Sequence, residues 1–151
     1  MNKGKIKNIL LVLLVFIFLS GCRSNRSLPK TGQVIIGDQI IRVEISRNSE
    51  VWKRGLSGRH NLEPNQGMLF VFSKPGFYQF WMRGMKFPLD IIWIQNGQIV
   101  GFVENASPSE NGEFFVFQPP IPVQYVLEVV AGSVKSYSWK IGDEVKFIFD
   151  N

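Results

Sequence analysis

Cysteine and histidine are almost missing from this chain, which has one of each in 151 residues. A single cysteine cannot form an intrachain disulfide, and together with one histidine it cannot supply the four ligands of a structural zinc site. The sequence also lacks a phosphate-binding glycine loop, a dinucleotide fingerprint and a Gly-x-Ser-x-Gly elbow. Charged residues are few, at 19%, against 45% hydrophobic residues. This composition argues against intrinsic disorder, and the length favours a single domain.

Acidic residues are missing from the first thirty positions, although the whole chain has a formal net charge of +5. Six of the 17 basic residues lie in this stretch, namely Lys3, Lys5, Lys7, Arg23, Arg26 and Lys30. From Thr31 onward, eleven basic residues accompany twelve acidic residues, which leaves a net charge of −1. The basic pI is therefore a property of the N-terminal stretch, and we expect no nucleic acid as a partner.

The N-terminal stretch has the pattern of an export signal. Lysines precede an uncharged run from Ile9 to Leu19, which is short for a membrane span. The run ends in Leu19-Ser20-Gly21-Cys22, which resembles the lipobox of bacterial lipoproteins. We therefore predict a lipoprotein signal peptide over residues 1–21 and lipidation of Cys22, the first residue of the mature chain. The alternative is an uncleaved anchor. Either way, we expect an exported chain held at a bacterial membrane on its extracytoplasmic side.

Residues 22–32 predict a flexible tether, because they are rich in Ser, Arg and Pro and show no apolar periodicity. Acyl chains on Cys22 would make the membrane a partner of the protein. Residues 33–151 predict one β-rich domain.

Alternating and continuous apolar runs indicate that this domain is mainly β. The expected strands are 33–36, 39–45, 67–72, 77–82, 89–95, 98–103, 123–130 and 144–149. Asn96-Gly97 predicts a type I′ hairpin turn, and Lys74-Pro75-Gly76 is expected to end the strand before it. Short helices are expected over 49–56 and 133–139, and a long loop over 104–122. We expect a compact barrel- or sandwich-like α+β domain of short antiparallel strands with one or two short helices.

Two carboxylates lie in apolar surroundings. Asp90 shares a strand face with Ile92 and Ile94, and Glu128 shares one with Val126 and Val130. A buried carboxylate needs a cation or backbone donors, and the best candidate cations are Arg54, Arg59 and Arg83. The pair could act as acid and base, or as the polar floor of a ligand pocket. The alternative, which we favour, is a structural ion pair that pins the short helix to the sheet.

A soft ligand set is a second candidate site. Met68, Met82 and Met85, with His60 and the indole of Trp81, would suit Cu(I) in an exported protein. Methionine is more often a core residue, and His60 lies in a polar turn, so the alternative is that they have no metal role. We favour no cofactor.

Six short motifs follow one another along the chain in an order that resembles a known family. They are Arg54-Gly55-Leu56-Ser57-Gly58-Arg59, Gly67-Met68-Leu69-Phe70, Phe80-Trp81-Met82, Pro88-Leu89-Asp90-Ile91-Ile92, Tyr125-Val126-Leu127-Glu128 and Ile141-Gly142-Asp143. With these motifs the chain, from about Ile40 to Phe149, resembles the family named domain of unknown function 192. The resemblance implies a small, mostly β domain of bacteria and archaea, often exported, with no established activity. Gly84 departs from the family pattern, which often has Asn there. If that position lines a pocket, the missing amide could change the ligand.

The leading hypothesis is a non-catalytic, membrane-tethered domain that binds a small ligand or a component of the cell envelope. Its predicted site consists of Arg54, Arg59, Trp81, Met82, Asp90 and Glu128, with Trp81 as an apolar or sugar-stacking wall. One alternative is a hydrolase, acting on glycans for example, that uses Asp90 and Glu128 about 5–10 Å apart in one cavity. The other alternative is the Cu(I)-binding protein. A purely structural interaction module would have no enclosed pocket.

Overall fold

The structure is a computed structural model, and it describes residues 30–108 and 115–150. The predicted signal peptide and Cys22 lie outside these residues. The described elements are β1 (Lys30–Ile36), β2 (Gln39–Ser46), α2 (Ser49–Arg54), β3 (Gln66–Gly76), β4 (Phe80–Trp81), β5 (Leu89–Gln95), β6 (Gln98–Ala106), β7 (Val116–Phe117), β8 (Val123–Val130), α3 (Ser133–Ser136) and β9 (Val145–Phe149). The prediction of a mainly β domain is confirmed. Within the described residues, neither helix has the length and apolarity needed to span a membrane.

Seven strands form one sheet in the order β6-β5-β8-β3-β2-β1-β9, and β4 pairs with β7 in a small second sheet. Neighbouring strands run antiparallel, as predicted, with the exception of β2 and β3. These two strands are parallel because the segment between them, which contains α2, crosses over before β3 begins.

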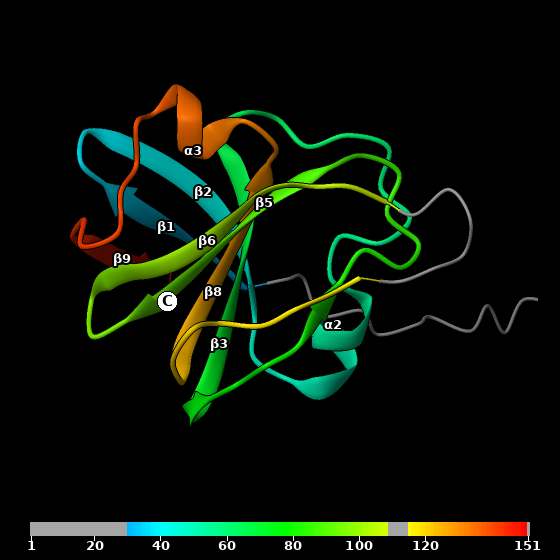
Figure 1. Cartoon of the computed structure of the whole chain (residues 1–151), viewed down its shortest axis with the longest axis horizontal. Coiled ribbons are helices and arrows are strands. Elements are labelled where there is room, and N and C mark those ends of the chain that lie inside the picture. Colours follow the sequence, from blue (N-terminus) through cyan, green and yellow to red (C-terminus); the bar gives the residue numbers. More distant parts are fainter. Residues whose placement is uncertain (1–29, 109–114, 151) are drawn as a thin grey trace, which may run out of the picture.

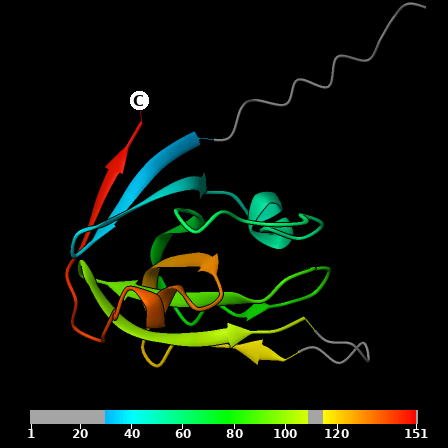
Figure 2. The same cartoon turned by 90° about the horizontal axis from the view of Figure 1, so that it is seen from above.

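The large sheet curls, so that β1, β2 and β9 face β5 and β6 across its interior (Figures 1 and 2). At one end the edge strands approach each other, and the bridge between Gln98 and Glu144 joins them without a continuous ladder. The inner face of the sheet holds a core that includes Ile41, Ile92 and Leu127. α3 lies across one end of this curl in both views, and its Val134 belongs to the inner core.

The outer face of β3, β5 and β8 carries a second core, which includes Met68, Phe70 and Val126. α2 lies on this side of the sheet, beside β3 and β8 (Figure 1). The register separates the two cores, because side chains alternate between faces along every strand. The inner and outer faces of β5 and β8 are therefore different environments one residue apart.

The boundaries differ from the predicted ones in a few places. The Asn96-Gly97 turn is confirmed, with φ of 52° and 71° at its two residues. β3 continues through Lys74 and Pro75 to Gly76, with an irregular register after Val71, whereas the sequence predicted a break. Bulges are one place where a sheet tolerates proline. The predicted strand 77–82 contracts to β4, and β1 begins at Lys30, within the range assigned to the tether.

Candidate functional site

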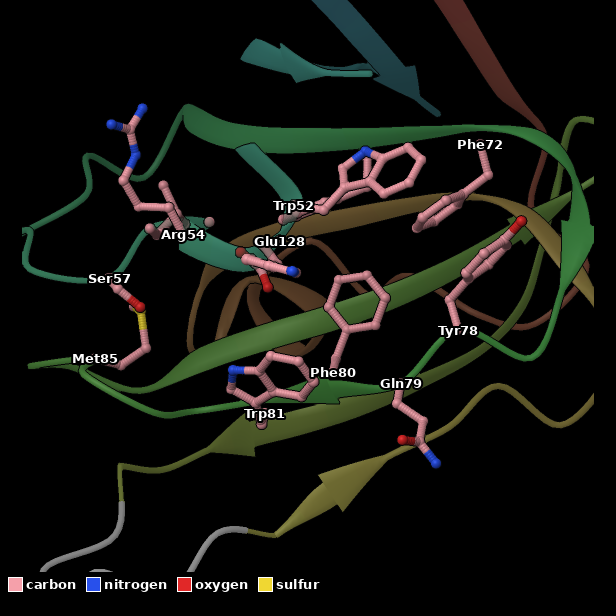
Figure 3. Close-up of a pocket in the computed structure, with 14 residues that line it drawn as sticks. Trp52, Arg54, Ser57, Phe72, Tyr78, Gln79, Phe80, Trp81, Met85 and Glu128 are labelled. Atoms are coloured by element: carbon pink, nitrogen blue, oxygen red, sulfur yellow. The ribbon is translucent and has the colours of Figure 1, made fainter. Parts of the chain in front are cut away.

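A cavity of about 180 Å³ lies on the outer face of the sheet, between α2 with its following loop and the segment that contains β4 (Figure 3). Six aromatic side chains line it, and the carboxyl of Glu128 lies among them. The lining residues are Trp52, Lys53, Arg54, Gly55, Leu56, Ser57, Phe70, Phe72, Tyr78, Gln79, Phe80, Trp81, Met85 and Glu128.

α2 forms one wall. The helix ends at Arg54 because Gly55 takes a left-handed conformation, with φ of 48°, that favours glycine. Trp52 fixes the helix to the sheet, since its indole Nε1 donates to the carbonyl oxygen of Ser46 at 3.1 Å. The Trp52 ring also packs on Phe72, with centroids 4.9 Å apart. The wall is therefore attached to β2 and β3 by one hydrogen bond and one ring contact.

Stacked and edge-on rings form the opposite side of the cavity. Phe72 and Tyr78 stack with centroids 3.5 Å apart, and Phe70 meets Phe80 edge to face at 5.0 Å. The Tyr78 hydroxyl donates to the Lys74 carbonyl oxygen at 2.8 Å, which holds the ring in the stack. Trp81 completes the wall and keeps 43% of its surface exposed. These contacts give the cavity a largely prearranged aromatic lining.

Two hydrogen bonds join the loop after α2 to the loop after β4. The Ser57 hydroxyl donates to the Arg83 carbonyl oxygen at 2.7 Å, and the Gly58 amide donates to the Gly84 carbonyl oxygen at 3.0 Å. The two walls of the cavity are thus tied together at one end. Gly84 has φ of 72° and is not itself among the lining residues, but a Cβ there would lie 3.5 Å from the side chain of Ser57, which does line the cavity.

Glu128 is the unusual group of the site. It lies on β8 opposite Met68 of β3 and Ile91 of β5, and only 7% of its surface is exposed. Among the described residues, none donates a hydrogen bond to its carboxyl or pairs with it as a cation. Burial raises the pKa of Glu128 to about 8. At neutral pH the carboxyl is therefore mostly protonated, and it can donate or accept a hydrogen bond.

Asp90 lies on the other face of the sheet. Its Oδ1 accepts from the Asn105 amide at 2.8 Å and its Oδ2 from the Val134 amide at 2.9 Å, and the residue is fully buried. The partners are backbone donors, which was one of the predicted possibilities, and no salt bridge between described residues involves Asp90. The acid and base hypothesis needed Asp90 and Glu128 in one cavity. The register contradicts this arrangement, because Asp90 is opposite Val129 while Glu128 is opposite Ile91.

Of the six residues predicted to form the site, Arg54, Trp81 and Glu128 line the cavity. Met82 is buried in the outer core. Arg59 turns to β2, where its two terminal nitrogens donate to the two carboxylate oxygens of Glu44 at 2.6 and 2.7 Å. This pair lowers the pKa of Glu44 and raises that of Arg59, chiefly through the side-chain hydrogen bonds. Arg59 and Glu44 line a different hollow, of about 340 Å³.

The copper hypothesis involves residues in different surroundings. Met68 and Met82 are buried in the outer core, Met85 lines the cavity, and His60 is exposed. In residues 30–108 and 115–150, no group of three or more His, Cys, Asp or Glu side chains is placed to hold a metal ion. Copper binding through thioethers stays a prediction.

Sequence reasoning missed most of the aromatic lining. The sequence pattern marks five of these rings only as apolar residues of an expected helix and of expected strands, namely Trp52, Phe70, Phe72, Tyr78 and Phe80. One signal was present: Phe70 and Phe72 alternate along β3 on the face of Met68, which pairs with Glu128. That signal is informative only when the register between β3 and β8 is known, and the sequence alone does not determine this register.

The molecule is a curled, mostly antiparallel β domain with a small aromatic cavity over one buried carboxyl. Residues 32–147 match domain of unknown function 192, a family described as uncharacterized ACR. The chain belongs to this family, as its motifs predicted.

Two solved structures are similar to this one. A protein from Sinorhizobium meliloti 1021, provisionally described as a transcription regulator, is 30% identical, with a TM-score of 0.70 over 80% of this chain and 94% of that chain. A protein of unknown function from Novosphingobium aromaticivorans DSM 12444 is 29% identical, with a TM-score of 0.68 over 79% of this chain and 84% of that chain. A comparison with curated proteins finds no match.

Proposed function

We propose that this protein is an exported, lipid-anchored domain that binds a small ligand in the cavity over Glu128. The observation that carries the binding proposal is the Glu128 carboxyl, which is buried, lines a cavity and has no partner among the described residues. Buried polar groups in native proteins are nearly always hydrogen-bonded, and leaving one unpaired costs about 1–3 kcal/mol. A ligand that enters the cavity would supply the missing partner.

The size and lining of the cavity indicate what kind of ligand fits. Its volume of about 180 Å³ is close to the roughly 150 Å³ of an engineered apolar cavity that holds benzene. A ring-sized apolar body therefore fits between the aromatic walls, and a polar group on it can reach Glu128. Ligand sites in proteins commonly combine apolar walls with a few polar groups in this way.

Regulation of transcription is not part of the proposal. That description belongs to the relative from Sinorhizobium meliloti. From Thr31 onward this chain has a net charge of −1, which does not favour binding to a phosphate backbone.

The anchoring part of the proposal is tested with the full chain expressed in a bacterium. We expect Cys22→Ala to move the protein from the membrane fraction to the soluble fraction, because no acyl chains can be attached. Ser24→Ala, which keeps Cys22, is the matched control and should stay in the membrane fraction. If Cys22→Ala also stays there, the protein is held by something other than a lipid on Cys22.

The binding part is tested with benzyl alcohol as a neutral, ring-sized probe and the indole NH signals of the four tryptophans as reporters. Trp52 and Trp81 line the cavity, while Trp93 and Trp139 are buried in the outer and inner cores. We expect the probe to shift the signals of Trp52 and Trp81 and to leave those of Trp93 and Trp139 in place.

Trp81→Ala should abolish this binding and leave the protein folded, since Trp81 belongs to the cavity wall and 43% of its surface is exposed. Phe77→Ala is the matched control, because Phe77 is an exposed aromatic residue outside the lining. Unchanged Trp52 and Trp81 signals in the wild-type protein, up to the solubility limit of benzyl alcohol, would contradict binding in this cavity.

A further inference from the structure

The polar groups around the cavity are mostly engaged outside it. The Trp52 indole, the Tyr78 hydroxyl and the Ser57 hydroxyl each donate to a backbone carbonyl oxygen. The side chains of Arg54 and Gln79 extend away from the centre of the cavity (Figure 3). A ligand therefore meets aromatic faces with the unpartnered carboxyl of Glu128 between them.

We propose that the polar group of the ligand is an organic ammonium, which places its positive charge against the Glu128 carboxylate and the surrounding aromatic faces. This inference rests on the proposed binding function and specifies its ligand class: a primary or methylated amine attached to a ring-sized apolar body. The geometry that supports it is a carboxyl that is more than nine-tenths buried, lining the same cavity as Phe80 and Trp81.

Electrostatics favours a cation at this place over an anion or a neutral group. The faces of Trp and Phe rings attract cations, and the attraction strengthens when water is excluded. A charge-assisted hydrogen bond to a carboxylate is about twice as strong as a neutral one. A ligand carboxylate would instead be placed against the Glu128 carboxyl, with which it can share only a proton.

The other charged and titratable groups of the lining are Lys53 and Arg54, from α2 and its end, and Tyr78, from the segment before β4. Met68 and Ile91, which flank Glu128 on β3 and β5, carry no charge. Lys53 and Arg54 oppose a cation, but both are exposed, so that water and salt screen them. Once Glu128 has given up its proton, its carboxylate is the charged group that burial leaves unscreened.

Binding of an ammonium is coupled to the protonation of Glu128. The pKa of the Glu128 carboxyl is about 8, so the carboxyl holds its proton below that pH. An ammonium that binds below this pH breaks the carboxyl O–H bond and sends the proton to the buffer, which leaves the carboxylate paired with the cation. The affinity for a ligand of fixed charge should therefore rise about tenfold per pH unit well below pH 8, more slowly near pH 8, and then level off.

The test compares three ring-sized probes of different charge, benzylammonium, benzyl alcohol and benzoate, by the Trp52 and Trp81 indole signals at about pH 8. We expect benzylammonium to bind about ten- to hundredfold more tightly than benzyl alcohol, and benzoate to bind most weakly. Glu128→Gln, which has nearly the same shape but no charge, should remove this preference, so that benzylammonium binds no more tightly than benzyl alcohol.

A pH series with benzyltrimethylammonium, whose charge is fixed, completes the test. In the wild-type protein its affinity should rise about fivefold from pH 7 to pH 8, and in Glu128→Gln it should stay constant. Equal binding of benzylammonium and benzyl alcohol, or preferred binding of benzoate, overturns the ammonium inference and leaves the proposed binding function standing. If none of the probes shifts Trp52 and Trp81, both are overturned.

Discussion

Two buried carboxyls on adjacent strands have opposite environments. Asp90 of β5 is on the inner face of the sheet, and Glu128 of β8 is on the outer face, one register position away. Asp90 is fully buried and accepts hydrogen bonds from two backbone amides. Glu128 is almost as deeply buried and has no partner among the described residues. Burial alone therefore does not distinguish a structural carboxyl from a candidate binding group. The two are distinguished by whether hydrogen-bond donors of the protein reach the carboxyl.

The donors of Asp90 come from two places where the backbone leaves regular structure. Val134 lies in the first turn of α3, where amides have no partner within the helix. Asn105 has φ of 54° beside an irregularity in the β5 and β6 register. Asp90 satisfies both amides and so joins α3 and β6 to β5. On the outer face, Glu128 instead lines the cavity.

The largest expected effect comes from removing the carboxyl of the inner face. Asp90→Ala removes the acceptor of the buried Val134 amide and of the part-buried Asn105 backbone amide. Hydrogen bonds to charged groups contribute about 1.5–3 kcal/mol each, so we expect the free energy of unfolding to fall by about 3–6 kcal/mol. Urea denaturation followed by circular dichroism measures this change.

Asp90→Asn is the control for that experiment, since it keeps one oxygen acceptor and should be less destabilising than Asp90→Ala. If Glu128 has no hydrogen-bond partner, Glu128→Leu should destabilise the protein far less than Asp90→Ala or even stabilise it, because no hydrogen bond is lost. If Asp90→Ala costs less than about 1 kcal/mol, Asp90 does not hold the inner face together.

Local patterns were enough to predict the seven strands of the large sheet and the hairpin at Asn96-Gly97, because alternation and turn chemistry depend on neighbouring residues. They did not predict β7, which lies within the expected loop 104–122. They also singled out Asp90 and Glu128 as unusual, since each shares a strand face with apolar residues. The face on which each carboxyl lies depends on register with other strands, and a shift of one residue reverses it. The sequence therefore identified both groups but placed them in one hypothetical site.

Arg59 is a second example of a contact that local sequence patterns do not predict. Its position in the chain favoured a role next to Arg54, but it pairs with Glu44, which is 15 residues away and lies on β2. This pairing depends on the parallel arrangement of β2 and β3, which a crossover through α2 produces. The rings of the cavity were missed for a related reason: an aromatic residue that lines a cavity has the same local pattern as one that fills a core.

A smaller effect, on the pH dependence of stability, tests the outer carboxyl. The ordinary pKa of a glutamate is 4.5, and burial raises that of Glu128 to about 8 in the folded protein. The folded state therefore holds a proton that the unfolded state releases, and stability is fully present below pH 4.5 and is lost as the pH rises toward 8. From pH 5 to pH 7 we expect this group to lower the free energy of unfolding by about 2–3 kcal/mol.

Glu128→Gln should abolish this decline, because an amide does not titrate. Denaturation of the two proteins at a series of pH values measures the difference, and subtraction removes the contributions of other groups. Among these, Glu44 has a lowered pKa and acts in the opposite direction, with stability lost only as the pH falls through that pKa. If the wild-type and Glu128→Gln curves run parallel from pH 5 to pH 8, Glu128 has a partner in solution. The carboxyls on both faces of the sheet would then be hydrogen-bonded, and the argument for a ligand in the cavity would fail.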